Sequence, residues 1–193
     1  MIILEDTRQQ TGKHDAKHDY FEKHGIEIRR TKLYVGDYTL PTNQSVCVDT
    51  KKDIQELVSD LITDHKRFRE ELIKAQESGI QLFILVENKG GLIRPTKDVY
   101  NKTIRNLDEL HSWKNPRLFI RKGGKQLYPK ATKGIQLQKM CYTMQQKYGV
   151  RFMFCAPEES GQRIIELLTN DVIEATNNDW CEFKWKDNDN AKR

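Results

Sequence analysis

Two aspartates and a lysine in the N-terminal third of the chain have the types and spacing of a hydrolytic centre. Asp37 is followed, after eleven intervening residues, by Asp49-Thr50-Lys51. Paired carboxylates provide hard oxygen ligands that suit Mg²⁺, which usually keeps several waters and uses few protein ligands. Such an ion could polarise a phosphate and lower the pKa of a bound water, while a neighbouring lysine could orient that water or offset growing charge. The spacing thus indicates phosphodiester hydrolysis.

A purely structural interpretation competes with this one. Asp37 follows Gly36, and an aspartate after a glycine is ordinary turn chemistry. An Asp-x-Lys triplet is also frequent in any charged sequence. On spacing alone, the structural interpretation is therefore the commoner outcome.

Short strands are expected to position these side chains. Residues 26–33 alternate apolar and charged side chains, turn-forming residues occupy 41–45, and an apolar run follows at 46–48. These patterns predict a meander of antiparallel strands over residues 29–49. Both aspartates would then occupy strand positions on either side of one turn.

Strand alternation predicts how the second motif is presented. Residues two apart in a strand point to the same face, so Asp49 and Lys51 should project together and Thr50 should project to the opposite face. The two acids and the lysine would then converge on one point.

The rest of the chain alternates between helical and strand patterns. Apolar side chains recur at helical spacing from Ile54 to Ile62, whereas residues 81–87 form a continuous apolar run, typical of a strand covered on both faces. These alternating patterns predict a single α/β domain of three layers around a mixed sheet. Strands are expected at 2–4, 81–87 and 150–155, and helices at 14–24, 54–62, around 68–75, at 135–148 and at 159–168.

The basic residues are concentrated in one part of the chain. Residues 89–151 contain fifteen Lys or Arg and three acids, a balance of +12, so the rest carries 5 − 12 = −7. Such a concentration favours a polyanionic partner, most commonly nucleic acid, over a surface that is merely solvated. Charge does not distinguish DNA from RNA. Residues 89–133 are also rich in Gly and Pro, which predicts a loop-rich insertion with a short helix near 103–113.

Cysteine and histidine spacing gives little support for a zinc site. His14 and His18 stand one helical turn apart without a companion ligand, which favours a solvated helix. The N-terminus has no pattern of a signal peptide, and no apolar run is long enough for a membrane span, so we expect an intracellular (cytoplasmic or nucleoid-associated) protein without a membrane partner. The cysteines have no zinc-type spacing and are expected to be reduced thiols: Cys47, Cys141, Cys155 and Cys181.

An ordered set of motifs resembles one nuclease family. The N-terminal part resembles the nuclease domain of the XPF-type structure-specific endonucleases, within the PD-(D/E)XK superfamily. Three motifs carry the resemblance, in the order that the family has them: Leu4-Glu5-Asp6-Thr7-Arg8, Val35-Gly36-Asp37-Tyr38 and Val48-Asp49-Thr50-Lys51. The helix segment Lys66-Arg67-Phe68 and the strand ending at Glu87 follow in the same order, and the resemblance covers most of residues 1–168.

The resemblance implies a fold, a cofactor and residue roles. The fold would be restriction-endonuclease-like, with a central mixed sheet flanked by helices. Asp37 and Asp49, with the Thr50 backbone carbonyl, would bind Mg²⁺ or Mn²⁺, and Lys51 would be the catalytic lysine. Asp6 and Arg8 would complete the catalytic set as active-site neighbours.

The sequence departs from the family pattern at three positions. Asp49 stands where a Glu is usual, and Thr50 stands where an Arg is usual. Aspartate is one methylene shorter, so an ion would sit nearer the strand, although the superfamily accepts either acid. Gln9 replaces an acid that normally follows the first-strand Arg, which removes one carboxylate from the expected site.

DNA contacts are expected from two regions. The resemblance implies that Arg67, with Lys66 beside it, contacts phosphate. The family's tandem helix-hairpin-helix domain would have to follow residue 168, where we expect only a tail, so the basic insertion would supply the remaining grip. Its candidate DNA-binding residues are Lys89, Lys122, Lys125 and Lys130.

The expected protein is thus a nuclease domain at 1–176 with a polar C-terminal tail at 177–193. We expect a divalent-metal-dependent endonuclease that hydrolyses DNA at branched, flap or junction structures. The alternatives are a catalytically inactive nucleic-acid-binding module of the same fold, and an RNA-directed or adaptor protein. Retention of all three chemical positions argues against the inactive module. A homodimer, or a protein partner that adds DNA grip, would be in keeping with the family.

Overall fold

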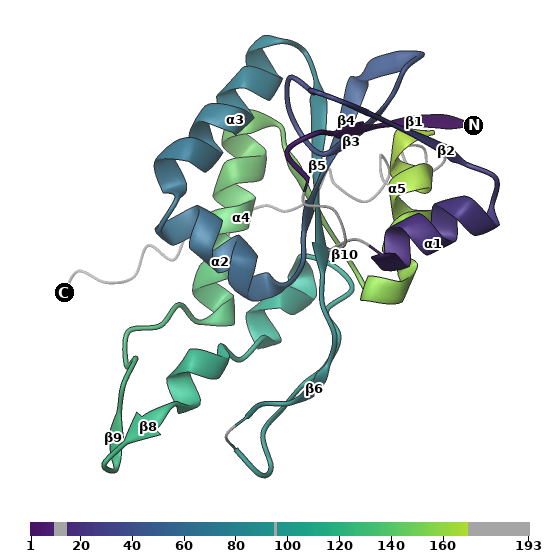
Figure 1. Ribbon diagram of the computed structural model, residues 1–193. Helices are drawn as coiled ribbons and strands as arrows, with labels where there is room; N and C mark the ends of the chain where they lie inside the picture. Colours follow the sequence, from purple (N-terminus) through teal and green to yellow (C-terminus); the bar gives the residue numbers. More distant parts are fainter. Residues whose placement is uncertain (10–14, 95, 170–193) are drawn as a thin grey trace.

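A six-stranded mixed sheet forms the centre of the computed structural model, which describes residues 1–9, 15–94 and 96–169. His14, Cys181 and the tail predicted at 177–193 lie outside the described residues. The spatial order of the strands is β10-β5-β4-β3-β1-β2 (Figure 1). Their bounds are β1 (Ile2–Asp6), β2 (Glu27–Thr31), β3 (Tyr38–Leu40), β4 (Asn43–Lys51), β5 (Gln81–Glu87) and β10 (Arg151–Cys155).

The pairing corrects one prediction about the N-terminal strands. β3 and β4 are antiparallel, as expected, but β2 does not pair with β3. β2 instead lies parallel to β1 at the edge of the sheet, and β1 separates it from β3. The meander predicted over 29–49 is therefore wrong in its first part. A helix connects β1 to β2, which permits the parallel crossover, and the chain from 32 to 37 then passes to the other side of β1.

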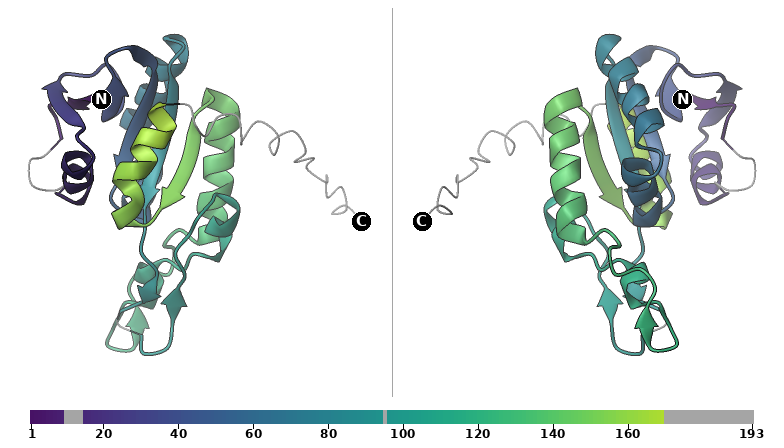
Figure 2. Two further views of the ribbon diagram at one scale, coloured as in Figure 1. Left: turned by 90° about the vertical axis from the view of Figure 1, so that its right-hand side faces the viewer. Right: turned by 90° about the vertical axis from the view of Figure 1, so that its left-hand side faces the viewer.

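Helices cover both faces of the sheet, so the fold is a three-layer α/β domain. Figures 1 and 2 show α2, α3 and α4 on one face and α1 and α5 on the other. No helix of the described residues is long and apolar enough to cross a bilayer. The helices are α1 (Asp15–Lys23), α2 (Ile54–Ile62), α3 (His65–Glu77), α4 (Gly134–Tyr148) and α5 (Ser160–Leu168).

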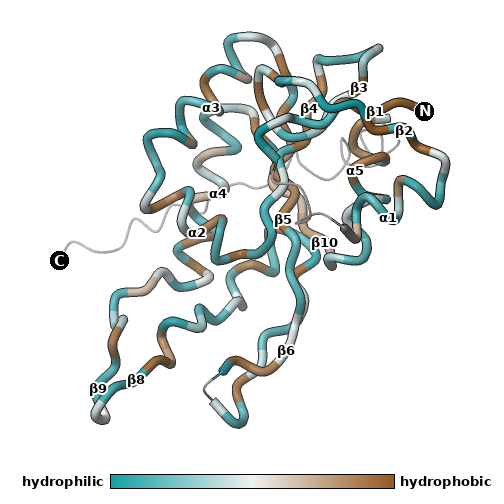
Figure 3. Tube along the Cα trace, viewed as in Figure 1, coloured by the Kyte–Doolittle hydropathy of each residue, from teal (hydrophilic) through white to brown (hydrophobic). Residues whose placement is uncertain are grey.

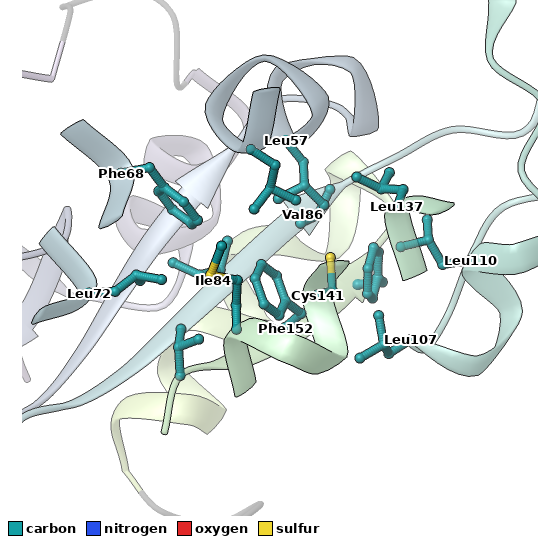
Figure 4. Packing of buried hydrophobic residues seen from close by; sticks show 14 of the residues in the cluster. Leu57, Phe68, Leu72, Ile84, Val86, Leu107, Leu110, Leu137, Cys141 and Phe152 are labelled. Atoms are coloured by element: carbon teal, nitrogen blue, oxygen red, sulfur yellow. The ribbon is translucent and has the colours of Figure 1, made fainter. Parts of the chain in front are cut away.

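Alternate side chains of strand β5 pack into the two cores on opposite faces of the sheet. Leu82, Ile84 and Val86 pack into the core beneath α2, α3 and α4, and Figure 4 shows Ile84 and Val86 there. Phe83 and Leu85 pack into the second core, beneath α1 and α5. Each such fully buried side chain contributes about 1.5–3 kcal/mol relative to exposure. The prediction that residues 81–87 form a strand covered on both faces is therefore confirmed.

Helix α2 begins immediately beyond the second acidic motif. The Asp53 carboxylate accepts a hydrogen bond from the Glu56 amide at 2.7 Å, which caps the helix. An apolar stripe then faces the sheet, and Asp60 is buried on this same side of the helix. The stripe consists of Ile54, Leu57, Val58 and Leu61.

The segment 89–133 forms two projecting arms and a packed base. We call residues 89–94 and 96–103 the β6–β7 arm and residues 120–132 the β8–β9 arm; Figure 1 shows both extending from the same end of the molecule. Ile104, Leu107 and Leu110 are buried and anchor the base in the core. The short elements are β6 (Gly91–Leu92), β7 (Tyr100–Asn101), β8 (Arg121–Lys122), β9 (Lys125–Gln126) and two 3-10 helices, η1 (Asp108–Ser112) and η2 (Pro116–Phe119).

Candidate active site

Asp37 and Asp49 come together at one end of the β3–β4 hairpin. Asp37 lies in the bend just before β3, one residue short of the strand position that was predicted. Tyr38 pairs with Val48, and continuing this register by one residue places Asp37 opposite Asp49. The Asp37 Oδ2 accepts hydrogen bonds from the Thr50 amide at 2.7 Å and from the Thr50 hydroxyl at 2.8 Å. The Asp37 carboxylate is thereby fixed against β4.

The bend that presents Asp37 depends on Gly36. Its φ is +72°, and a Cβ there would lie 3.1 Å from the Val48 carbonyl oxygen, so the position favours glycine for both reasons. The Gly36 amide donates to Glu71 Oε1 at 3.1 Å. The Glu71 carboxylate of helix α3 therefore fixes the position of the bend.

Lys51 lies between two acids on the same face of the sheet as Asp49. Its Nζ is 2.6 Å from Asp49 Oδ2 and 2.9 Å from Asp60 Oδ2 on α2. The ammonium also lies 5.5 Å from the centre of the Phe68 ring on α3. All three charged groups are buried, which strengthens their mutual attraction. As the alternation predicted, Asp49 and Lys51 project together, toward α2 and α3.

Burial and neighbouring charges move the pKa values of these groups in opposite senses. Burial, together with the charge of the nearby Asp37, raises the pKa of Asp49 to about 7 against the attraction of the Lys51 ammonium. Burial also raises the pKa of Asp37, although the Thr50 amide opposes this. Burial alone would lower the pKa of Lys51, but Asp49 and Asp60 outweigh it and raise that pKa. Lys51 is therefore a permanent cation at neutral pH.

The donor set fits a divalent ion that keeps most of its waters. Asp49 Oδ2 is buried with the Lys51 ammonium 2.6 Å away, and a carboxylate oxygen in such an ion pair keeps a further lone pair for a cation. Within residues 1–9, 15–94 and 96–169, no group of three or more His, Cys, Asp or Glu side chains is placed to hold a metal. Two carboxylates plus water suit Mg²⁺ better than a metal that needs an all-protein cage.

These groups open onto a cavity of about 360 Å³. Arg67, whose side chain is 78% exposed, lies at the cavity with its Nη2 3.5 Å from Asp60 Oδ1. An exposed guanidinium in this place could bind a phosphate oxygen. The lining residues are Arg8, Gln9, Gly36, Asp37, Asp49, Thr50, Lys51, Glu56, Asp60, Arg67, Phe68 and Glu71.

Asp6 and Arg8 of the first-strand motif have different roles. The Asp6 carboxylate accepts the Arg8 amide at 2.7 Å, two hydrogen bonds of 2.8 Å from the Arg8 guanidinium, and the Leu33 amide at 2.9 Å. Burial would raise the pKa of Asp6, but these hydrogen bonds outweigh it and lower that pKa. Asp6 does not line the cavity, whereas Arg8 does. Asp6 thus holds Arg8 and the start of the 33–37 segment in position.

The other basic candidates do not converge on this cavity. Lys66 is exposed on α3 beside Arg67 but is not among the lining residues. Lys89 lines a separate groove at the base of the β6–β7 arm. Lys122 and Lys125 are cross-strand partners near the tip of the β8–β9 arm, and Lys130 is exposed in a turn beyond β9. Their role in DNA binding stays a prediction.

Sequence reasoning missed two acids of the site. Asp60 contacts Lys51, and Glu71 holds the Gly36 amide, yet neither belongs to the motifs that drew attention. A usable signal was present for both. Asp60 interrupts the apolar stripe of α2, and Glu71 stands three residues after Phe68 on the stripe of α3, so each places an acid on a face that packs inward.

Among the residues that the structure describes, no cysteine or histidine lines this cavity. Cys47, Cys141 and Cys155 are buried and free. His18 contacts Glu5, with Nε2 2.7 Å from Oε1, on the opposite side of the sheet. Their positions give no metal centre among the described residues.

Comparison with known proteins locates this geometry in a family. The model of the ERCC4 domain matches residues 6–168. The fold is similar to "XPF from Aeropyrum pernix", at a TM-score of 0.55 and 16% identity, over 92% of this chain and 69% of that one. It is also similar to "XPF from Aeropyrum pernix, complex with DNA", at 0.53 and 18%, over 90% and 66%. None of the curated proteins matches the chain.

Proposed function

The chain belongs to the ERCC4 domain family, and on this premise we propose that it is a divalent-metal-dependent endonuclease acting on DNA. Its substrates would be phosphodiester bonds at branched, flap or junction structures. This substrate class is that of the structure-specific endonucleases that the Val35–Tyr38 and Val48–Lys51 motifs resemble. One of the structural relatives is described in complex with DNA, which supports DNA as the polymer.

One observation carries the proposal: Asp37, Asp49 and Lys51 lie on one cavity, with the lysine held by buried carboxylates. Burying charged groups costs desolvation free energy, and even a buried ion pair adds little net stability. A purely structural role therefore gives little reason for charged groups at these positions. A hydrolytic site, by contrast, needs charges fixed before the substrate arrives. The geometry therefore favours a chemical role for the three residues.

Asp37 and Asp49 would hold the divalent ion, Mg²⁺ or Mn²⁺, with the Thr50 carbonyl as a further ligand. When bound there, the ion would act as a Lewis acid on the phosphate and lower the pKa of a water. The Thr50 amide and hydroxyl keep one Asp37 oxygen directed at β4. Asp49 lines the same cavity, with its buried Oδ2 paired to the Lys51 ammonium.

Lys51 would act as a fixed cation. Asp49 and Asp60 raise its pKa and so favour the charged ammonium. An ammonium at this place can donate a hydrogen bond to the attacking water or to a phosphate oxygen as negative charge grows. Asp60 holds the other side of the same ammonium and limits its rotation.

Arg8 and Arg67 would receive the phosphates that flank the scissile bond. Both guanidinium groups line the cavity and are largely exposed, at 61% and 78%. Arg8 is oriented by Asp6, whereas Arg67 has only a long contact with Asp60. Such contacts position a strand without reading its sequence. The cations of the two arms would extend this grip along the DNA.

The experiment is a cleavage panel with labelled flap, fork and plain duplex DNA, with Mg²⁺ or with a chelator. We expect cleavage of the branched substrates in Mg²⁺ only, and little cleavage of the duplex. Equal cleavage of all three would contradict the substrate class. Binding of the branched DNA without cleavage in Mg²⁺ or Mn²⁺ would instead support the inactive nucleic-acid-binding module.

A further inference from the structure

A second groove, distinct from the active-site cavity, lies at the base of the β6–β7 arm. It has a volume of about 500 Å³. One wall is the start of α2, from Asp53 to Gln55, and the other is the arm itself with Trp113 and Pro116 below it. The remaining lining residues are Asn88, Lys89, Gly90, Gly91, Leu92, Ile93, Arg94, Asn101 and Lys102.

The groove adjoins the catalytic strand through the register of the sheet. Lys51 pairs with Val86, so β4 and β5 reach the same end of the sheet together. The chain leaves β5 at Asn88 to form the arm and leaves β4 at Lys51 to start α2. The two walls of the groove therefore continue directly from the strands that build the active site.

The arm carries an aromatic ring that its own fold leaves exposed. Tyr100 and Leu92 are cross-strand partners on β7 and β6, and they are 60% and 42% exposed. Figure 3 shows hydrophobic colour on this arm, although it projects from the body. Of the eight large hydrophobic residues exposed in the described part of the chain, four lie on the two arms. An exposed aromatic beside cations is typical of a base-stacking platform.

The base of the arm is fixed well enough to present that ring. Gly90 approaches the backbone so closely that a Cβ would lie 2.7 Å from the Thr103 nitrogen. The Gly90 amide donates to the Thr103 hydroxyl at 3.0 Å. The Asn101 side chain accepts the Lys114 amide at 2.8 Å and donates to the Lys114 carbonyl at 2.9 Å. The Gly90–Thr103 contacts join the two sides of the arm at its base, and the Asn101–Lys114 bonds fix β7 to the segment between η1 and η2.

The polar groups of the groove are suited to a polyanion. Lys89, Arg94 and Lys102 are its cations, and its one acid, Asp53, is already engaged as the cap of α2. The Gln55 Nε2 is buried, lines the groove, and has no hydrogen-bond partner among the described residues. An unused donor next to three cations is a feature that a phosphate or a base edge would satisfy.

We propose that this groove binds a single-stranded stretch of the nucleic acid that leaves the active site. The Tyr100 ring, which is not part of the lining but is the cross-strand partner of the lining residue Leu92, would stack on an unpaired base at the edge of the groove. Lys89, Arg94 and Lys102 would hold the phosphates of that stretch. This inference rests on the proposed function for its DNA substrate, and it adds where the unpaired strand of a flap or fork lies. A duplex offers no unstacked base to the ring, so the groove would select for unpaired nucleotides.

The test measures binding rather than cleavage, in an Asp49→Asn background, so that failure of the nuclease proposal is a separate result. Fluorescence anisotropy follows a labelled oligothymidylate of about 15 nucleotides and a duplex of equal length. We expect Tyr100→Ala to weaken single-strand binding by about 10-fold and Tyr100→Phe to restore it, since base stacking needs only the ring. Duplex binding should change by less than about twofold.

Tyr128→Ala is the matched control, because Tyr128 is an exposed tyrosine on the other arm, outside this groove, with the Arg117 guanidinium 6.0 Å from its ring centre. Its single-strand affinity should stay close to that of the parent. Equal affinities for Tyr100→Ala and its parent, or an equal loss in Tyr128→Ala, would overturn the proposal. An oligouridylate of the same length distinguishes the polymer: tighter binding of the RNA would overturn the assignment to DNA.

Discussion

Lys51 on β4 and Asp60 on α2 form a buried ion pair, with 2.9 Å between Nζ and Oδ2. The pair joins the catalytic strand to the helix that follows it, and Asp49 contacts the same ammonium from the other side at 2.6 Å. Lys51 is thus positioned by two acids, of which only Asp49 belongs to the motif that the sequence displays.

Replacing Asp60 by Asn should slow cleavage without weakening DNA binding. The neutral amide no longer holds the ammonium in place, and loss of a group that orients a catalytic residue costs about 10- to 100-fold in rate. Single-turnover rates at saturating DNA measure the effect, and anisotropy measures binding. Asp64→Asn is the control, since Asp64 is exposed just beyond α2, at the N-cap of α3, and its side chain makes no capping hydrogen bond. A rate equal to that of the control would contradict the positioning role.

Replacing Gly36 by Ala should lower both stability and cleavage. The new Cβ would face the Val48 carbonyl at 3.1 Å while φ stays positive, which costs about 1–3 kcal/mol in strain. Gly79→Ala isolates the dihedral cost, because Gly79 has φ +65° and nothing within 4 Å of a Cβ. Urea denaturation should show the larger loss for Gly36→Ala, and only that variant should cut more slowly. Equal losses in the two variants would mean that the crowding at Gly36 does not matter.

Cleavage at limiting Mg²⁺ should fall as the pH drops through about 7. The pKa of Asp49 is raised to about 7 by burial, and the carboxylate binds a cation only when it has lost its proton. Above this pH the group is charged and the site is competent; below it the group is neutral and the ion must displace a proton. Single-turnover rates across the range give the profile. A rate that does not change between about pH 6 and pH 8 would contradict this role of Asp49.

Neutralising Lys122, Lys125 and Lys130 together to Gln should weaken DNA binding and flatten its salt dependence. Each lost phosphate contact reduces the slope of log K against log salt by about 0.9. The three side chains are exposed on the β8–β9 arm, so the fold should persist. The matched control neutralises Lys23, Lys32 and Lys74, which are equally exposed elsewhere. A slope that stays the same in the arm variant would exclude the arm as a DNA contact.

Local patterns were sufficient to predict most elements of the sheet and its helices. The apolar run of β5 and the apolar stripe of α2 each indicate one type of secondary structure, because the spacing of the apolar residues matches a buried strand in the first and a helix in the second. The order of the strands is a different matter. Pairing of β2 with β1 depends on which way the chain crosses after Thr31, and no residue between 32 and 37 encodes that choice locally.

The site was predicted only as far as its motifs reach. Asp37, Asp49 and Lys51 are neighbours in a hairpin, so their meeting follows from strand geometry. Asp60 and Glu71 arrive from helices whose packing angle the sequence does not show, although acids on inward faces were a visible clue. The arms were expected to be loops, because strands of two residues leave no periodic pattern.

The most direct test of the central claim is the single-turnover cleavage rate of branched DNA by Asp49→Asn in Mg²⁺. The amide keeps the size of the side chain but removes the charge that would bind the ion, so we predict a loss of at least about 100-fold relative to wild type. Asp19→Asn, an exposed aspartate on α1, should cut at the wild-type rate. If Asp49→Asn also cuts at that rate, Asp37, Asp49 and Lys51 are not the hydrolytic centre.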